Sequence, residues 1–207
     1  MGGDPPIEVL LLRPVTAPPL VLASASPRRS ELLQRVGLSF DICPADIDET
    51  PKPDESPAAL VERLSREKAR TVAEALRGSY LVVAADTIVV RDGTILNKPP
   101  TPDAAKGMLR SLGGRSHEVI TGWAMTRDDG RSLAGNVVTR VHFRELNDHV
   151  VERYVATGEP MDKAGAYGIQ GVGAMLVTRI EGSYTNVVGL PLVEILQALP
   201  QLGGPAL

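Results

Sequence analysis

The chain has 207 residues, 43% of them hydrophobic, and a formal net charge of −3. This composition is typical of a globular protein with one sizeable core, and it offers no broad basic surface for sequence-nonspecific nucleic-acid binding. No apolar run reaches the ~20 residues of a membrane-spanning helix, and the single Cys43 cannot form an internal disulfide. We therefore expect a cytoplasmic protein that binds neither membranes nor nucleic acid.

The N-terminal stretch, residues 1–19, is rich in proline around a short apolar segment. Its acidic rather than basic start differs from that of a signal peptide. We expect a poorly ordered leader over residues 1–19, followed by a single domain over residues 20–207.

The first third of the chain predicts two strands and two helices. The apolar residues 20–22 predict a strand, and Pro27 suits the first turn of a helix. A short strand over residues 39–42 and a polar loop follow. Ser56 then caps a long helix that runs to about residue 76.

The rest of the chain alternates strands with helices. An apolar strand over residues 80–85 is interrupted by Asp86 and Thr87, resumes over residues 88–90 and turns back at the Asp92-Gly93 hairpin. Further strands are expected over residues 95–96, 117–126, 134–143 and 174–180, and further helices over residues 101–112, after Asn147 and over residues 190–199. The pattern predicts an α/β fold whose mixed sheet has parallel and antiparallel strands.

The run from Ser24 to Arg29 places two hydroxyls and two adjacent guanidiniums directly after the first strand. With Pro27 in the first turn, this strand leads straight into a helix N-terminus, where free N–H groups and the helix dipole favour an anion. Arginine donors match phosphate oxygens in pairs. The run therefore favours a polyphosphate site. The alternative is a capped helix whose arginines lie in solvent.

Lys68 lies in the middle of the apolar face of the long helix, among leucines and valines at helical spacing. A desolvated ammonium costs several kcal/mol without an anion, so a protein carboxylate or a bound ligand should meet it. The alternative is a lysine whose stem packs while its head reaches water.

Asp86 follows an apolar strand, and ionised side chains seldom occupy such a place without a ligand, a metal or a capping duty. Because no helix follows within a few residues, metal binding or water activation is the better interpretation. The acidic loop at Asp46, Asp48 and Glu49 could help to hold Mg²⁺ beside substrate phosphates, although a solvated loop is the plainer alternative.

Two further segments suggest contacts with a nucleotide. Lys98, just beyond the hairpin, could neutralise a phosphate, or it could be an exposed loop lysine. The glycine-rich segment 159–171 would let the backbone approach a ligand, and its Gln170 can donate and accept at once, as a base edge requires. A tight structural loop is the alternative. The three histidines lack metal-ligand spacing and are expected to be structural.

Five of these segments together resemble the signatures of the Maf nucleotide pyrophosphatases, in the same order over about residues 20–199. They are Leu22–Arg29, Glu67–Ala69, Ala85–Thr87, Lys98–Pro99 and Asp162–Gly171. The resemblance implies an elongated, two-lobed α/β structure with a mixed sheet and a central cleft, related to the inosine triphosphate pyrophosphatase (ITPase) fold, and a homodimer.

The resemblance also implies a reaction, in which a nucleoside triphosphate is hydrolysed between its α- and β-phosphates with the help of a divalent cation, Mg²⁺ or Mn²⁺. Asp86 would be the catalytic residue, taking a proton from water or binding the metal with Glu49. The residues implied to bind phosphates are Ser24, Arg28, Arg29, Lys68 and Lys98, and those implied to set substrate choice are Arg28, Thr87 and Gln170.

Within the family, the Pro27–Arg29 run and the Gly168–Gly171 segment resemble the branch that acts on dTTP and UTP, and on modified pyrimidine nucleotides. The 7-methyl-GTP branch typically has Trp after the Pro and no such Gln. The implied role is house-cleaning of the nucleotide pool, with a link to arrest of cell division. Two alternatives stay open: an ITP/XTP-type pyrophosphatase, and a regulator of septum formation that binds nucleotide without turnover.

Overall fold

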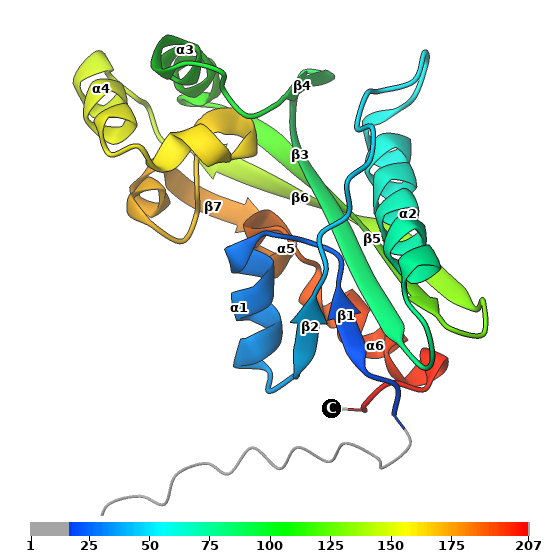
Figure 1. Ribbon diagram of the computed structural model, residues 1–207. Coiled ribbons are helices and arrows are strands. Elements are labelled where there is room, and N and C mark those ends of the chain that lie inside the picture. Colours follow the sequence, from blue (N-terminus) through cyan, green and yellow to red (C-terminus); the bar gives the residue numbers. More distant parts are fainter. Residues whose placement is uncertain (1–16, 207) are drawn as a thin grey trace, which may run out of the picture.

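A computed structural model describes residues 17–206 of the chain (Figure 1). The expected leader therefore lies almost wholly outside the described residues, and the single-domain boundary stays a prediction. Within residues 17–206, no helix is long and apolar enough to cross a membrane.

Seven strands form one mixed sheet in the order β2-β1-β3-β5-β6-β7, with β4 beside β3. The pairs β1–β2 and β1–β3 are parallel and the others are antiparallel, which confirms the predicted mixed α/β class. The strands are β1 (Leu20–Leu22), β2 (Phe40–Ile42), β3 (Leu81–Arg91), β4 (Thr94–Leu96), β5 (Ser116–Arg127), β6 (Ser132–Phe143) and β7 (Val177–Glu181).

Three helices begin at the capping residues that the sequence predicts. The side chains of Ser56, Thr101 and Asn147 each accept a hydrogen bond from the backbone N–H three residues on. The helices are α1 (Pro27–Arg35), α2 (Pro57–Ala75), α3 (Pro102–Leu112), α4 (Asp148–Ala156), α5 (Tyr184–Val188) and α6 (Leu192–Ala198), with 3-10 turns η1 (Glu159–Asp162), η2 (Ala164–Ala166), η3 (Val172–Leu176) and η4 (Pro200–Leu202).

Two elements near the C-terminus differ from the prediction. The strand expected over residues 174–180 begins only at Val177, because the preceding residues form η3. The helix α5 was not predicted, since five residues are too few to show helical periodicity.

The β3 strand is continuous, so Asp86 and Thr87 do not interrupt it as the sequence suggested. Both residues keep extended geometry because β5 pairs with β3 along its whole length, including Asp86 opposite Gly122. Asp86 therefore lies in the middle of a strand and not at the end of one.

The other edge of β3 has a gap. Its first residues pair with β1 and its last residues, Val89–Arg91, pair with β4. Among the described residues no strand pairs with residues 84–88 on that edge. The interruption leaves backbone groups of β3 without a strand partner beside Asp86, at the point where β1 runs into α1.

The two faces of the sheet are covered differently (Figure 1). On one face, α2 packs along β3 and β5 over the side chains of Val82, Ala84, Ile88 and Val90. On the other face there are two apolar clusters, one under α1, α5 and α6 and one under α3 and α4. These clusters form the cores of two lobes, and β3 passes through both.

His117 lies in the core under α3 and α4, where its ring meets the edges of Phe143 and Tyr167. Its Nε2 atom is 2.8 Å from the Tyr167 hydroxyl. Burial lowers the pKa of His117 to about 4, so the ring is neutral at physiological pH. These contacts give His117 the structural role that the sequence indicated.

Gly122 allows α2 to lie unusually close to the sheet. A Cβ atom at this position would overlap the carbonyl oxygen of Val61 on α2. Because Gly122 is the cross-strand neighbour of Asp86, the same close approach brings α2 down onto Asp86.

The Gly122→Ala substitution should lower the free energy of unfolding by about 2 kcal/mol or more, since the helix must move away from the sheet to admit the methyl group. Urea unfolding followed by circular dichroism measures the change. Gly107→Ala on α3 is the matched control, because a Cβ there meets nothing within 4 Å, and it should be neutral or stabilising by up to about 1 kcal/mol. Equal stability of the two variants would contradict the close approach.

Candidate active site

A cleft of about 730 Å³ opens at the unpaired edge of β3. The site residues that the family resemblance implied all line this one cleft: Ser24, Arg28, Arg29, Glu49, Lys68, Asp86, Thr87, Lys98 and Gln170. They come from both lobes and from both faces of the sheet. The structure thus brings these residues together, while their individual roles stay predictions. Asp46 and Asp48, the other two acidic residues of the loop that was expected to help hold Mg²⁺, do not line the cleft.

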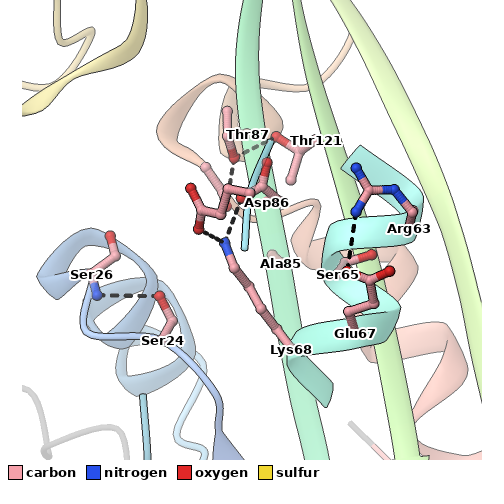
Figure 2. A network of polar contacts seen from close by, with 12 residues as sticks. Ser24, Ser26, Arg63, Ser65, Glu67, Lys68, Ala85, Asp86, Thr87 and Thr121 are labelled. Carbon is pink, nitrogen blue, oxygen red and sulfur yellow. Dashed lines mark hydrogen bonds and ion pairs between the residues drawn. The ribbon is translucent and has the colours of Figure 1, made fainter. Parts of the chain in front are cut away.

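Lys68 lines the cleft and contacts two carboxylates. Its Nζ atom lies 2.6 Å from Asp86 Oδ1 and 2.6 Å from Glu49 Oε1. Figure 2 shows the side chain extending from α2 toward Asp86 on β3. The side chains of Lys68 and Asp86 are about nine-tenths buried, whereas Glu49 is 59% exposed. The expectation that an anion meets this buried ammonium is confirmed, and the anions are protein carboxylates.

The loop that carries Glu49 is fastened to α2 by Arg63. Its guanidinium donates to Glu55 at 2.6 Å and to the backbone carbonyl of Thr50 at 3.1 Å. The hydrogen bonds from Arg63 lower the pKa of Glu55 to about 2. Because Thr50 directly follows Glu49, this attachment sets the distance from the Glu49 carboxylate to Lys68. Sequence reasoning missed Arg63, which looks like any charge on a solvated helix face.

The start of α1 forms another wall of the cleft. The Ser26 N–H donates to Ser24 Oγ at 3.2 Å, and the Ser26 side chain caps none of the helix N–H groups. Ser26, Pro27 and Arg28 all line the cleft. The N–H groups of the first turn therefore remain for an anion, as the sequence suggested.

Arg29 is largely committed to protein acceptors. Its guanidinium donates to the Gly189 and Ala85 carbonyls at 2.8 Å each, and to hydroxyls of Ser24 and Thr87 at 3.1 Å. The Ala85 carbonyl belongs to the unpaired edge of β3. Burial lowers the pKa of Arg29, and the nearby Asp86 opposes that shift. Arg29 thus ties α1, β3 and the α5 turn together, which the sequence did not reveal.

A buried chain of polar contacts continues from Thr87 across the neighbouring strands to α5. Its hydroxyl lies 3.0 Å from that of Thr121 (Figure 2), which donates to the Asn186 carbonyl at 3.1 Å. The Asn186 side chain donates to the Val119 carbonyl and to Thr139 Oγ1. Thr121 and Asn186 are fully buried. This chain separates the two apolar clusters and fixes Thr87, the residue expected to influence substrate choice.

The glycine-rich segment is tied to α4. The Glu159 carboxylate accepts from the Val172 N–H at 2.8 Å, the Gly173 N–H at 3.0 Å and the Tyr154 hydroxyl at 2.8 Å. Space beside Gly171 is filled by Glu159 itself. The glycines were expected to admit a ligand, but Gly165, Gly168 and Gly171 instead admit the protein side chains of Val89, Lys163 and Glu159. The segment is a braced loop that presents Gln170 to the cleft.

Additional charges lie at the mouth of the cleft. Arg28 Nη1 pairs with Asp162 Oδ2 at 2.9 Å, and Lys163 also contacts Asp162. Lys98 lines the same region and forms no ion pair with any residue in the described range. The sequence contained Asp162 and Lys163 within a motif but gave them no part in the site.

The carboxylates fit a cation that arrives with a polyphosphate. Within residues 17–206, no group of three or more His, Cys, Asp and Glu side chains could hold a metal alone. Glu49 and Asp86 nevertheless converge on one ammonium group. Mg²⁺ is commonly bound by one or two carboxylates together with substrate phosphates, which is the donor set available here.

Comparison with known proteins shows which proteins this chain is similar to. A family model described as Maf-like protein matches residues 19–202. A dTTP/UTP pyrophosphatase of Geobacter sulfurreducens is 54% identical over 89% of this chain and 96% of its own length. A dTTP/UTP pyrophosphatase of Moorella thermoacetica is 54% identical over 89% of this chain and 95% of its own length. Among solved structures, a HAM1 protein from Coxiella burnetii has 17% identity and a TM-score of 0.49, covering 88% of this chain and 98% of that one.

The Lys68→Met substitution should lower the free energy of unfolding by about 2–3 kcal/mol, because it leaves the Asp86 carboxylate buried beside Glu49 without a cation. Urea unfolding at neutral pH measures this. Adding Asp86→Asn should restore part of the loss, since the buried charge is then removed.

Lys106→Met is the control for this comparison. Lys106 pairs with Asp103 at 2.9 Å on the surface, where Asp103 is 90% exposed, and its loss should cost no more than about 0.5 kcal/mol. A Lys68→Met variant as stable as Lys106→Met would show that the ammonium is not required by the carboxylates.

Proposed function

The chain belongs to the family of Maf-like proteins, and we propose that it is a nucleoside triphosphate pyrophosphatase. It hydrolyses dTTP and UTP to the monophosphate and pyrophosphate. The observation that carries the proposal is the convergence of basic and acidic side chains on one cleft around Lys68. The names of relatives more than 50% identical over most of this chain support the pyrimidine substrates.

In this proposal Asp86 accepts the proton of the attacking water. Lys68 donates to Oδ1, and no residue in the described range donates to Oδ2, so Oδ2 remains for the water. The hydrogen bond from the ammonium fixes the orientation of the carboxylate, as a general base requires. Water held on Oδ2 then lies in the cleft, where it can approach the α-phosphorus in line with the leaving pyrophosphate.

The basic side chains of the cleft bind the triphosphate. Arg28, Lys98 and the first turn of α1 receive its oxygens, and the hydroxyls of Ser24 and Ser26 donate further hydrogen bonds. Arg29 uses four of its five N–H donors on protein acceptors, and the remaining one can donate to a phosphate oxygen. Glu49 and Asp86 would hold a divalent cation, Mg²⁺ or Mn²⁺, which when bound would offset the negative charge of the phosphates.

Recognition of the base is assigned to the glycine-rich segment that carries Gln170. Gln170 carries both a donor and an acceptor, and the contacts of Glu159 brace the loop on which it lies. The pyrimidine O4 and N3–H edge offers the complementary pair. Thr87 and Arg28 complete the set that discriminates between nucleotides. The resemblance to the family further implies a homodimer, which light scattering after gel filtration would measure.

The direct test is pyrophosphate release from a panel of nucleoside triphosphates with Mg²⁺ or Mn²⁺. We expect release from dTTP and UTP, and a loss of at least about 100-fold in kcat for Asp86→Asn, because a general base contributes about 10²–10⁴-fold. Asp92→Asn is the matched control. It lies just past the same strand with a φ of 50°, which asparagine tolerates, and its rate should equal that of the wild type.

The other outcomes select the alternatives. Preference for ITP or XTP would make the chain a purine pyrophosphatase with the same chemistry. Stoichiometric binding of UTP without pyrophosphate release, under any metal, would make it a nucleotide-binding regulator. Full activity of Asp86→Asn would remove Asp86 from the mechanism.

A further inference from the structure

Asp162 forms an ion-pair bridge across the mouth of the cleft. Its Oδ2 atom lies 2.9 Å from Arg28 Nη1, and its Oδ1 atom lies 2.5 Å from Lys163 Nζ. Arg28 and Asp162 are separated by 134 positions in the sequence and come from opposite lobes. All three side chains line the cleft.

The two cationic side chains are less exposed than the carboxylate between them. Lys163 donates to the Glu159 carbonyl at 2.8 Å, and its stem packs against Gly168, where an added Cβ would lie 2.7 Å from Lys163 Cε. The side chains of Lys163 and Arg28 are 16% and 28% exposed, whereas that of Asp162 is 63% exposed. Asp162 can therefore turn into solvent while Lys163 stays bonded to the Glu159 carbonyl. Arg28, whose only side-chain hydrogen bond within residues 17–206 is to Asp162, is then free for another acceptor.

A carboxylate held by an arginine and a lysine presents the same pattern of acceptors as two oxygens of a phosphate. Burial disfavours the charged form of Asp162, but hydrogen bonds from Lys163 and Arg28 outweigh this and lower its pKa to about 2. The carboxylate is thus ionised at every working pH. In the absence of substrate, Asp162 pairs with Arg28 and Lys163, and a phosphate group can replace it there.

We propose that Arg28 and Lys163 together form a phosphate-binding pair of the substrate site, and that Asp162 occupies this pair between turnovers. Lys163 is then a further substrate-binding residue, and Asp162 is a built-in competitor of the phosphates. The inference rests on the proposed pyrophosphatase function.

The exchange has a consequence for product release. An entering triphosphate replaces the Asp162 carboxylate on Arg28 and Lys163, so the cations are paired both before and after binding. When pyrophosphate leaves, Asp162 returns to the same cations and the site loses no ion pair. Asp162 thus weakens the binding of product and substrate phosphates, and it leaves contacts to the nucleoside untouched.

Isothermal titration calorimetry with Mg²⁺ tests this, with three probes: pyrophosphate, thymidine and the non-hydrolysable analogue α,β-imido-dTTP. For Asp162→Asn we expect about 3- to 10-fold tighter binding of pyrophosphate and of the analogue, which is the worth of a partly exposed ion pair. Affinity for thymidine should not change. In turnover assays, inhibition by pyrophosphate should strengthen by the same factor.

Lys163→Met should weaken the binding of pyrophosphate and of the analogue by about 10-fold. Lys163→Arg keeps the positive charge and should restore most of the lost affinity. Asp148→Asn is the matched control, because Asp148 pairs with Arg110 at 2.7 Å, is 73% exposed and does not line the cleft. Its dissociation constants should equal those of the wild type.

Two results overturn the proposal. One is identical pyrophosphate affinity in Asp162→Asn and in Asp148→Asn, and the other is unchanged affinity in Lys163→Met. Either would do so even if the wild type hydrolyses dTTP normally. Failure of the proposed function has a different signature, in which the wild type itself releases no pyrophosphate from dTTP.

Discussion

Lys68 places an ammonium group on the buried face of α2, where water is scarce, and this charge requires anions from the elements around it. Asp86 on β3 and Glu49 on the loop before α2 supply these anions, and each carboxylate lies 2.6 Å from the Lys68 Nζ atom. Gly122 permits the contact because it lets the helix backbone lie directly on the sheet. One electrostatic requirement therefore fixes the height of α2 above β3 and the position of both carboxylates.

The second constraint is the interrupted edge of β3. Between the residues paired with β1 and those paired with β4, the backbone groups on this edge of the strand have no strand partner within the described residues. Arg29 uses one of them, the Ala85 carbonyl, and reaches Gly189 on the far side. A strand that continues through two lobes, with its edge open between them, offers both a rigid support and access to ligand. The charged residues of the cleft come from elements that meet at this opening.

Sequence reasoning found the charges and missed the scaffold that holds them. Lys68 was predictable because helical periodicity put it on an apolar face, and the caps at Ser56, Thr101 and Asn147 were predictable from local hydrogen bonding. Asp86 was placed at the end of a strand, since pairing with β5 is a long-range contact that local polarity obscures. Thr121 does break an apolar strand, a signal that could have been used, whereas Arg63 resembles any surface charge. The family resemblance joined residues that no spacing rule connects.

The central claim is that water in this cleft attacks the α-phosphorus of the nucleotide. Turnover of dTTP in H₂¹⁸O, followed by mass spectrometry of both products, tests it most directly. The account predicts one ¹⁸O atom in the thymidine monophosphate and none in the pyrophosphate, because the bond broken lies between the α-phosphorus and the bridging oxygen. Label in the pyrophosphate would mean attack at the β-phosphorus and would contradict the account.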